Sequence, residues 1–318
     1  MKVLLSHHLR DNFITELREA FPQIDFVLAM TPEEQAREAK DAEIIWGVVH
    51  REGFLAARNL KWFCYIGIGI DTMLKAVPEL RDSDVPMTLS RGTHVGAMAD
   101  HVFATILAFA HRLPDAIEDQ KQRVWDTGKY HRTIRELAGS TLGILAFGDI
   151  GRAVAQRAVG FDMTIYAVDL FPAEPPEGVC AVWGPDRLDE LMRISDWLVV
   201  TAPWTPETCG MVGRDQLAQA KEGSHIVVVS RGGVVDETAL ADALRAGRVH
   251  GAALDAMVSE PPSDNDPLWN MPNTIITAHT SAESAENYDR RGEIFKENLR
   301  RYLAGEPLMY VVDKKRGF

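Results

Sequence analysis

The chain has 318 residues, of which 46% are hydrophobic and 25% charged, a balance and a length typical of a globular protein with two cores. Its formal net charge of -12 and sequence pI near 5.3 create a field that repels nucleic-acid phosphates and anionic membrane surfaces. The three cysteines, Cys64, Cys180 and Cys209, are far apart and lack metal-ligand spacing. We therefore expect no disulfide framework, no metal site and a reducing, cytoplasmic location.

The N-terminal segment MKVLLSHHLRDNF lacks the apolar core and small-residue cleavage site of a signal peptide. The longest apolar run, residues 102–110, is far shorter than the roughly 20 residues that span a bilayer. The sequence thus predicts a soluble protein without a membrane partner.

Strand-like and helix-like patterns alternate over the first ninety residues. The short β-rich runs are KVLLS, DFVLAM, EIIWGVV, LKWFCYIGIGI and VPMTLS, and the segments DNFITELREAF and TPEEQAREAKDA between them have helical periodicity. Alternation of this kind favours a parallel sheet that is flanked by helices.

A long apolar-rich helix is expected from His94 to Pro114, which ends it, and a polar stretch with scattered bulky residues follows. A second series then begins at Thr141, with seven strand candidates: TLGILAFG, TIYAVD, VCAVW, WLVVTAP, SHIVVVS, HGAALDA and TIITAH. Seven strands separated by helices or loops predict a doubly wound nucleotide-binding sheet.

The final amphipathic segment, SAENYDRRGEIFKENLRRYLAG, is predicted to be a helix that returns to the first domain. The substrate domain is then discontinuous and consists of residues 1–97 and 283–318. The dinucleotide-binding domain consists of residues 98–282.

The segment TLGILAFGDIG reads as a strand, a glycine-bearing turn and the start of a helix. The dinucleotide fingerprint has three glycines, and Gly148 and Gly151 take the second and third positions while Ala146 takes the first. We expect the methyl group of Ala146 to be tolerated if its backbone angle is ordinary. The backbone amides of Asp149 and Ile150 should hold the pyrophosphate at the helix N-terminus.

Asp169 is the acidic residue at the end of the next strand, 18 positions after Gly151. Its carboxylate can accept hydrogen bonds from the ribose hydroxyls and would repel a 2′-phosphate. The following LFPAEPPE offers no arginine or lysine to receive that phosphate. The sequence therefore predicts NAD(H) in preference to NADP(H).

Arg231, Glu260 and His279 stand at the ends or flanks of three consecutive strand-like segments. A guanidinium fork, a carboxylate and an imidazole at one sheet edge can bind a 2-oxo acid and protonate its carbonyl oxygen. Arg231 would grip the substrate carboxylate, His279 would be the general acid, and Glu260 would hydrogen-bond the other imidazole nitrogen. Each residue alone also has an ordinary structural role, as a surface ion-pair partner, a loop acid or a hydrogen-bonded histidine.

With these motifs, the chain resembles the D-isomer-specific 2-hydroxyacid dehydrogenases over nearly all of its length. Further stretches that carry the resemblance are YIGIGID, APWTPETCGMV, VVVSRGGVVDETAL, GAALDAMVSEPP and TAHTSA. APWTPET, Trp46 after EII, and VVDKKRGF resemble most the glyoxylate/hydroxypyruvate reductase branch. The resemblance implies a two-domain α/β fold with a Rossmann-type sheet and a flavodoxin-like substrate domain. It also implies a homodimer, with an interface from the helix after Thr93 and the polar arm around Trp125.

The resemblance and the chemistry together extend the predicted site. Free amides at Ile68 and Gly69 in YIGIGID form an expected backbone anion site for the substrate carboxylate, and Trp46 and Trp204 are candidate pocket walls or core residues. Asp255 resembles a family aspartate near the nicotinamide carboxamide. The further expected cofactor contacts are Ala202, Pro203, Val229, Ser230, Arg231, His279 and Ser281. The chain departs from the common family pattern at Ala146, His94, Thr201 and Ser230.

The predicted function is NAD(H)-dependent interconversion of a small 2-oxo acid, such as glyoxylate or hydroxypyruvate, and its D-2-hydroxy acid. Two alternatives remain open. One is an NAD(H)-sensing binding protein without catalysis on the same fold, and the other is a dehydrogenase of a larger hydroxy acid, such as a phosphorylated one.

Overall fold

A computed structural model describes residues 1–271 and 273–314 and divides by its internal contacts into two units. Unit 1 consists of residues 1–94 and the chain from residue 284 onward, and unit 2 consists of residues 95–283. The domain boundaries expected from the sequence fall at 97/98 and 282/283. The end of the VVDKKRGF stretch, residues 315–318, lies outside the described residues.

Unit 1 contains a five-stranded parallel sheet. Its strands are β1 (Lys2–Ser6), β2 (Asp25–Leu28), β3 (Ile44–Gly47), β4 (Trp62–Tyr65) and β5 (Met87–Thr88). The strand order is β2-β1-β3-β4-β5, which is the flavodoxin-like order, and every neighbouring pair is parallel. The five strands predicted in this part of the sequence are confirmed.

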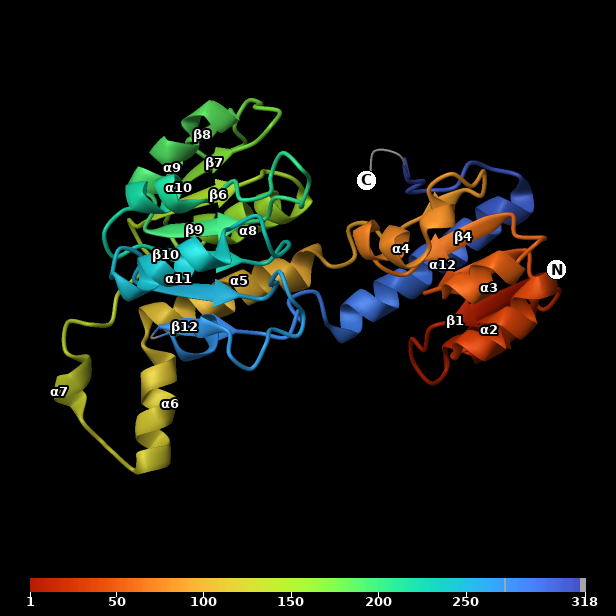
Figure 1. The fold of residues 1–318 in the computed structure, drawn as a ribbon, viewed down its shortest axis with the longest axis horizontal. Helices are drawn as coiled ribbons and strands as arrows, with labels where there is room; N and C mark the ends of the chain where they lie inside the picture. Colours follow the sequence, from red (N-terminus) through yellow and green to blue (C-terminus); the bar gives the residue numbers. More distant parts are fainter. Residues whose placement is uncertain (272, 315–318) are drawn as a thin grey trace. The chain divides into compact units, whose positions relative to one another are not determined.

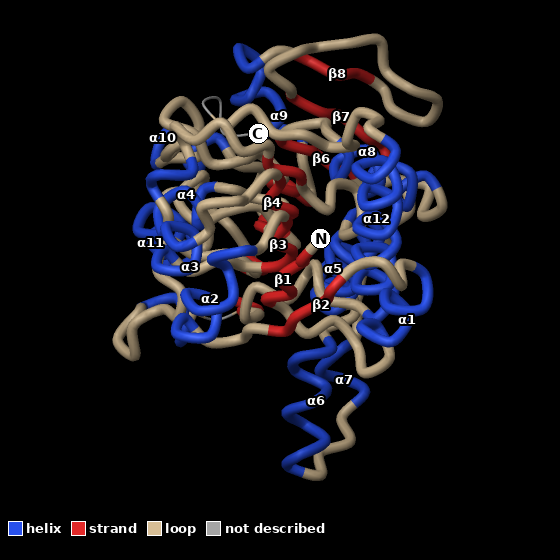
Figure 2. Tube along the Cα trace, turned by 90° about the vertical axis from the view of Figure 1, so that its right-hand side faces the viewer, coloured by secondary structure: helices blue, strands red, loops and turns tan. Residues whose placement is uncertain are grey.

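Helices cover both faces of this sheet (Figures 1 and 2). They are α1 (Phe13–Ala20), α2 (Pro32–Glu38), α3 (Arg51–Ala56), α4 (Asp71–Ala76) and α12 (Ala285–Ala304), with short 3₁₀ turns η1 (Ala39–Asp41) and η2 (Pro78–Leu80). α1 and α12 share one apolar cluster, whereas η1 and α4 contribute to the other. The return of α12 to unit 1 confirms the predicted last helix, which Ser284 caps by accepting a hydrogen bond from the N–H of Asn287 at 3.1 Å.

Unit 2 contains a seven-stranded parallel sheet of the doubly wound type. Its strands are β6 (Thr141–Leu145), β7 (Thr164–Val168), β8 (Ala181–Trp183), β9 (Trp197–Val200), β10 (His225–Val228), β11 (Gly251–Leu254) and β12 (Thr274–Ile276). The order is β12-β11-β10-β9-β6-β7-β8, so the direction of winding reverses between β6 and β9. All seven predicted strands are confirmed, and the fold is a two-domain, Rossmann-type α/β fold. In such sheets ligands bind at the carboxyl ends of the strands near this reversal.

The helices of unit 2 lie on two sides of its sheet (Figure 2). They are α5 (Val95–Ala110), α6 (Leu113–Gln122), α7 (Thr127–Tyr130), α8 (Asp149–Val159), α9 (Leu188–Ile194), α10 (Arg214–Gln219) and α11 (Glu237–Arg245), with 3₁₀ turns η3 (Pro185–Arg187) and η4 (Pro267–Asn270). α5 and α8 pack into one apolar cluster with the sheet, and α9, α10 and α11 pack into the other. Because both faces are covered, the central strands β9, β10 and β11 are buried along their whole length.

The predicted helix from His94 to Pro114 is instead two helices. α5 ends at Ala110, Arg112 has a left-handed backbone with φ of 55°, and Pro114 lies in the first turn of α6. Proline is favoured in a first turn, where its missing N–H would have no helical partner. Pro114 therefore begins a helix here, and the polar stretch after it forms α6 and α7.

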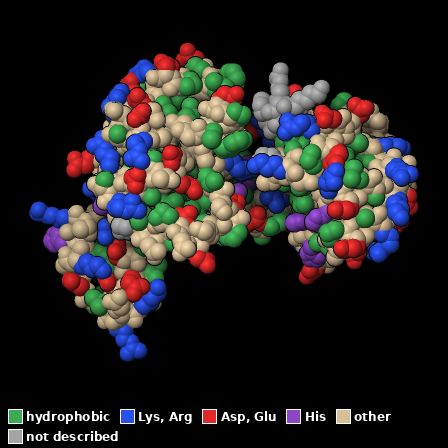
Figure 3. All heavy atoms as spheres, viewed as in Figure 1, with side chains coloured by type: hydrophobic (Ala, Val, Ile, Leu, Met, Phe, Trp, Pro, Cys, Tyr) green, Lys and Arg blue, Asp and Glu red, His purple; other side chains and the backbone are tan. Residues whose placement is uncertain are grey.

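Acidic and basic side chains are interspersed over the face of the molecule in Figure 3. Among the residues that the structure describes, no helix combines the length and apolar character that crossing a bilayer requires.

Candidate active site

The glycine-bearing turn joins β6 to α8, as the sequence predicts, but it strains one residue. Ala146 has φ of 76°, in the left-handed region. An alanine is disfavoured there because its Cβ crowds the following carbonyl, whereas glycine is not. The condition under which the methyl group of Ala146 would be tolerated, an ordinary backbone angle, is therefore not met. The turn requires this conformation whichever residue occupies the position.

The two glycines of the turn differ in how much space surrounds them. A Cβ at Gly148 would meet no atom within 4 Å, whereas a Cβ at Gly151 would lie 2.5 Å from the carbonyl oxygen of Ala146. Gly148, the N-cap of α8, thus leaves the turn open to a ligand, and Gly151 lets the helix approach the strand. The N–H groups of Asp149 and Ile150 lie in the first turn of an 11-residue helix, where N–H groups lack helical acceptors. These features fit a dinucleotide pyrophosphate.

Asp169, directly after β7, is anchored beside this turn. Its carboxylate accepts hydrogen bonds from the backbone N–H of Phe147 at 2.6 Å and of Phe171 at 2.9 Å. The two contacts place the carboxylate at the carboxyl edge of the sheet, where a ribose would lie. Carboxylate oxygens have further lone pairs, so Asp169 keeps the capacity to bind hydroxyl groups.

Arg187 is a candidate cofactor residue that the sequence did not reveal. The N–H of Asp169 donates to the carbonyl oxygen of Trp183 in β8 at 2.9 Å, and the guanidinium carbon of Arg187 lies 4.4 Å from the centre of the Trp183 ring. Arg187 also pairs with Glu190. Arg187 is 18 positions beyond Asp169 in the sequence. Only the pairing of β7 with β8 brings Trp183, on which Arg187 lies, next to the end of β7.

The ends of β9 and β10 carry four other predicted cofactor contacts. Ala202 and Val229 are buried and Pro203 is exposed, while Ser230 is buried with a hydroxyl that has no hydrogen-bond partner among the described residues. Just before them, the Thr201 hydroxyl donates to the carbonyl oxygen of Ala146 at 2.7 Å. Thr201, one of the departures from the family pattern, therefore supports the strained turn.

The three predicted catalytic residues follow three adjacent strands. Arg231 comes after β10, Glu260 after β11 and His279 after β12, and these strands are neighbours in the sheet. Because the strands are parallel, their carboxyl ends meet at one edge, the same edge that carries the glycine turn.

His279 and Glu260 are in direct contact. Nδ1 of His279 lies 2.8 Å from Oε2 and 3.0 Å from Oε1 of Glu260. Glu260 Oε1 also accepts the backbone N–H of Met257 at 3.0 Å, which orients the carboxylate. The side chains of His279 and Glu260 are 37% and 41% exposed, so the imidazole remains accessible at the sheet edge. An Nδ1–H held by a carboxylate directs Nε2 to a ligand, which is the arrangement of a general acid–base histidine.

Asp255 organises the segment that carries His279. Its carboxylate accepts hydrogen bonds from the Thr277 hydroxyl at 2.6 Å and from the N–H groups of Thr280 at 2.8 Å and Ser281 at 3.0 Å. Burial by itself would raise the pKa of Asp255, but hydrogen bonds from residues 277–281 outweigh it, and the pKa is lowered. Asp255 is therefore a buried carboxylate that positions the loop of His279. Ser281, another predicted cofactor contact, is buried within that loop.

Arg231 begins a tight turn at the end of β10. Its Nη1 donates to the carbonyl oxygen of Ser230 at 2.8 Å. A Cβ at Gly232 would lie 2.0 Å from the carbonyl carbon of Met257, so only glycine lets the turn pack against the chain after β11. Gly233 has φ of 82° and would place a Cβ 3.3 Å from Nε1 of Trp204. Trp204 therefore packs beside this turn, while Arg231 stays half-buried at the edge.

The predicted site residues of unit 1 divide into two kinds. Ile68 and Gly69 lie half-buried in the loop between β4 and α4, at the carboxyl edge of the unit 1 sheet. Trp46 is 0% exposed, with its ring centre 5.2 Å from those of Phe13 and Phe295. The reading of Trp46 as a pocket wall is corrected to a core residue, because apolar helices cover β3 on both faces.

Among the described residues, no group of three or more His, Cys, Asp or Glu side chains lies close enough to hold a metal ion. The site consists instead of a dinucleotide turn and an arginine, glutamate and histidine set on one edge of a doubly wound sheet. These features define a two-domain protein of the Rossmann-type dehydrogenase class.

Comparison with known proteins specifies the family. The model of the family described as D-isomer specific 2-hydroxyacid dehydrogenase, NAD binding domain, matches residues 103–281. A D-3-phosphoglycerate dehydrogenase of Archaeoglobus fulgidus is 31% identical over 317 residues, which are 98% of this chain and 59% of that protein. A glycerate dehydrogenase of Methylorubrum extorquens is 28% identical, with 96% of each chain covered.

A solved structure leads to the same family. A D-isomer specific 2-hydroxyacid dehydrogenase from Xanthobacter autotrophicus Py2, in complex with NADPH and MES, is 28% identical with a TM-score of 0.83 and covers 100% of this chain and 99% of that one. This chain therefore belongs to the D-isomer specific 2-hydroxyacid dehydrogenase family. It spans little more than half the length of its D-3-phosphoglycerate dehydrogenase relatives, 59% in the one from A. fulgidus.

Proposed function

We propose that the chain is an NAD(H)-dependent oxidoreductase that interconverts a small 2-oxo acid and its D-2-hydroxy acid. The observation that carries the proposal is the 2.8 Å contact of His279 with Glu260, on strand ends next to the one that carries Arg231. This set combines a cation for a carboxylate with a proton donor for a carbonyl oxygen.

In the proposed mechanism each residue has one task. The guanidinium of Arg231 binds the carboxylate of the 2-oxo acid. Within unit 1, the backbone amides of Ile68 and Gly69 are proposed as an anion site. Nε2 of the protonated His279 donates its proton to the 2-oxo oxygen, which becomes the hydroxyl of the product. Glu260 holds Nδ1 and stabilises the imidazolium before the transfer. A nicotinamide dinucleotide held by the glycine turn would supply the hydride for the carbonyl carbon.

In the reverse direction, neutral His279 accepts the hydroxyl proton at Nε2, and Glu260 stabilises the imidazolium that forms. We propose that the dinucleotide is held by the turn at Gly148, Asp149, Ile150 and Gly151. Asp169 would bind its ribose, and the ends of β9 and β10 would line the nicotinamide side.

NADH is the proposed cofactor in preference to NADPH. A carboxylate at Asp169 repels a 2′-phosphate, and the nearest cation that we identify, Arg187, already pairs with Glu190. The relative from X. autotrophicus was solved with NADPH, so the fold by itself does not select NADH.

Glyoxylate and hydroxypyruvate are the proposed substrates. Supporting observations are the sequence stretches of the glyoxylate/hydroxypyruvate reductase type and the glycerate dehydrogenase relative, since oxidation of the 2-hydroxyl of glycerate yields hydroxypyruvate. The similarity to D-3-phosphoglycerate dehydrogenases favours a second candidate, a phosphorylated hydroxy acid.

The deciding experiment follows NADH and NADPH oxidation with glyoxylate, hydroxypyruvate, pyruvate and 3-phosphohydroxypyruvate, with His279→Gln as the matched inactive variant. Turnover of the two small acids with NADH supports the proposal. Turnover confined to the phosphorylated acid selects the second candidate. Tight NADH binding without turnover of any acid would leave a nucleotide-sensing protein.

A homodimer is also proposed, with the segment of α6 and α7 in its interface. This segment projects from the rest of unit 2 (Figure 1) and exposes apolar side chains, notably Trp125, which is 96% exposed. Exposed apolar clusters of this kind mark association surfaces. Sedimentation of the wild-type chain and of Trp125→Asp tests the proposal, and an unchanged monomeric mass for both would refute it. The reduced cysteines Cys64, Cys180 and Cys209 are in keeping with the proposed cytoplasmic location.

A further inference from the structure

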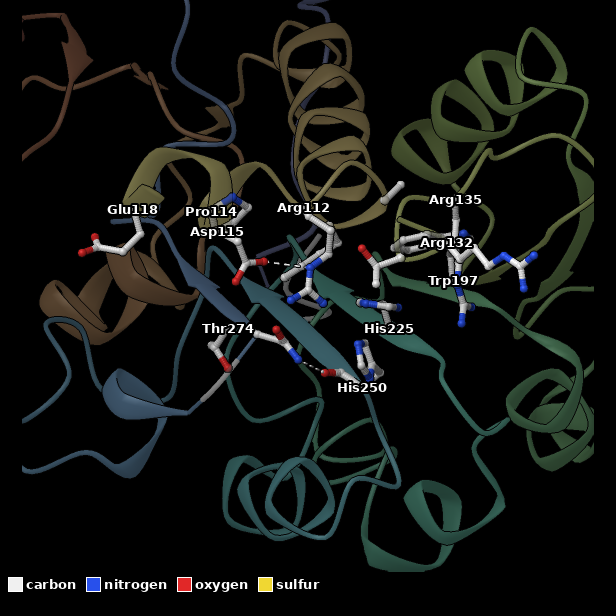
Figure 4. A pocket seen from close by; sticks show the side chains of 14 residues that line it. Arg112, Pro114, Asp115, Glu118, Arg132, Arg135, Trp197, His225, His250 and Thr274 are labelled. Carbon is white, nitrogen blue, oxygen red and sulfur yellow. Dashed lines mark hydrogen bonds and ion pairs between the residues drawn. The ribbon is translucent and has the colours of Figure 1, made fainter. Parts of the chain in front are cut away.

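A second cavity lies at the amino-terminal edge of the unit 2 sheet, opposite the candidate active site. It has a volume of about 400 Å³. The first residues of β9, β10 and β12 form its base, and the end of α5, the start of α6 and residues 132–135 form its walls (Figure 4). Strands of four residues separate the two edges by roughly 13 Å. The proposed mechanism uses no residue of this cavity.

Three arginines line the cavity, and they differ in how their charge is balanced. Nε of Arg112 pairs with Asp115 at 2.8 Å. Among the described residues, by contrast, no carboxylate forms an ion pair with Arg132 or Arg135, although the chain as a whole carries a net charge of -12.

The two acidic residues of the wall are occupied by other partners. Asp115 is neutralised by Arg112, and Glu118 accepts hydrogen bonds from Lys121 at 3.3 Å and from Gln122 at 2.9 Å. In Figure 4 the carboxylate of Glu118 lies at the outer end of the group, far from His225 and His250. The lining of the cavity therefore has a surplus of positive charge, carried by the exposed Arg132 and Arg135.

Two histidines stand at the centre of the cavity between the arginines (Figure 4). The ring of His225 stacks on Trp197, with a centre distance of 4.5 Å, and meets His250 edge-on at 5.2 Å. Burial, then the neighbouring His250 and Arg135, lower the pKa of His225 to about 3. Burial and the two arginines Arg112 and Arg135 also lower the pKa of His250.

Both imidazoles are thus neutral near pH 7, and the positive charge of the cavity resides on the guanidinium groups. Neutral imidazoles still offer N–H donors. Thr274 and Asn273, two further polar residues, also line the cavity.

We propose that this cavity binds a small polyanion, a di- or tricarboxylate or a phosphate ester, through the guanidinium groups of Arg132 and Arg135. Guanidinium forks bind carboxylate and phosphate oxygens in pairs, and both chemical classes present the same oxygens. The volume lies within the range of small-molecule sites. The imidazole N–H groups complete the hydrogen bonding of the ligand.

The experiment is calorimetric titration of the full chain with citrate and, separately, with glycerol 2-phosphate, at constant ionic strength and with or without excess NADH. Saturable binding of either anion that NADH leaves unchanged is expected. Arg132→Gln and Arg135→Gln should each weaken it on the order of tenfold, because each removes one charged hydrogen-bond donor from the site. Citrate alone or phosphate alone would specify the class of ligand.

Two matched variants make the test specific. Arg214→Gln removes the same charge from α10, where Arg214 pairs with Asp242, and should bind the anion as the wild type does. Arg231→Gln should also retain the affinity, because it alters only the candidate active site. Arg132 and Arg135 are exposed, so unchanged thermal unfolding of their variants without ligand serves as the folding control.

Three results would overturn the proposal. They are the absence of saturable heat with both anions, equal affinity of Arg135→Gln and the wild type, and binding that NADH or Arg231→Gln abolishes. A fourth would be anion binding that arises only when Trp125→Asp converts a dimer to a monomer. In that case a second copy of the chain would occupy the cavity.

Discussion

The backbone N–H of His279 donates to the carbonyl oxygen of Asp255 at 3.0 Å, while the carboxylate of Asp255 binds the residues on both sides of His279. His279 itself has φ of 53°, in the left-handed region. A single buried aspartate thus holds the loop in a conformation that its histidine would not adopt alone. The position of the imidazole depends on Asp255 as much as on Glu260.

Replacing Asp255 with asparagine should therefore lower both stability and turnover. The N–H groups of Thr280 and Ser281 donate to different oxygens of Asp255, so the new N–H₂ group would face one of them, and that buried donor would lose its acceptor. A loss of about 1–3 kcal/mol in the free energy of unfolding is expected from denaturant titration. Asp264→Asn, at an exposed position, is the control and should change stability by less than about 0.5 kcal/mol. Full turnover by Asp255→Asn would show that the loop does not need this anchor.

His279→Gln should reduce kcat on the order of 10²- to 10⁴-fold, because it removes the proposed proton donor. The dissociation constant for NADH, measured by fluorescence titration, should hardly change. Glu260→Gln keeps a hydrogen-bond acceptor but loses the charge that stabilises the imidazolium, so its kcat should fall between those of the wild type and His279→Gln. If His279→Gln turns over at the wild-type rate, the histidine has no part in proton transfer.

Ala146→Gly should stabilise the protein by about 1 kcal/mol, because glycine relieves the left-handed strain at φ of 76°. Thermal unfolding gives the measurement. Ala153→Gly, in the interior of α8, is the matched control and should destabilise by about 1 kcal/mol. Equal destabilisation by the two changes would mean that the turn of the native protein is not left-handed at Ala146.

Asp169→Ala should reduce the preference for NADH over NADPH, measured as the ratio of kcat/KM for the two cofactors. Asp169→Asn is the sharper variant, since it keeps an oxygen for the N–H groups of Phe147 and Phe171 and removes only the charge. In an Asp169→Asn background, Arg187→Gln should lower NADPH use again if Arg187 receives the 2′-phosphate. An unchanged ratio for both Asp169 variants would remove this residue from cofactor selection.

His225 should make the fold sensitive to acid. Its pKa is about 3 in the folded chain, against 6.5 for an ordinary histidine, so between these values only the unfolded chain binds this proton. Stability then falls as pH decreases below 6.5, by about 1.4 kcal/mol per pH unit from this group. Denaturant titrations from pH 7 to pH 5 should show a shallower decline for His225→Gln than for the wild type. The exposed His111→Gln should retain the wild-type slope, and identical slopes for all three chains would contradict the assignment.

Local sequence patterns determine much of the fold, so many of its elements could be predicted from the sequence. Each strand is a short apolar run between turn residues, and each helix has a periodic face, so the twelve strands and the last helix could be predicted. The prediction of one helix from His94 to Pro114 was wrong because a proline can either follow the end of a helix or lie in the first turn of the next. Only the packing of α5 against the sheet decides between the two.

The sequence by itself determined the family, the glycine turn and the order of Arg231, Glu260 and His279. These features lie in short continuous motifs, and the residue types in each motif indicate its backbone conformation or its chemical role. Tertiary structure alone decided the rest. The burial of Trp46, the role of Asp255 in positioning His279, the strain at Ala146 and the pairing of Asp169 with Trp183, on which Arg187 lies, all depend on contacts between segments apart in the chain. The second cavity depends on them too, since α5, α6 and the starts of separate strands meet there only when the sheet has formed. Such contacts leave no periodic or local signature in one sequence, so no reading of neighbouring residues could predict them.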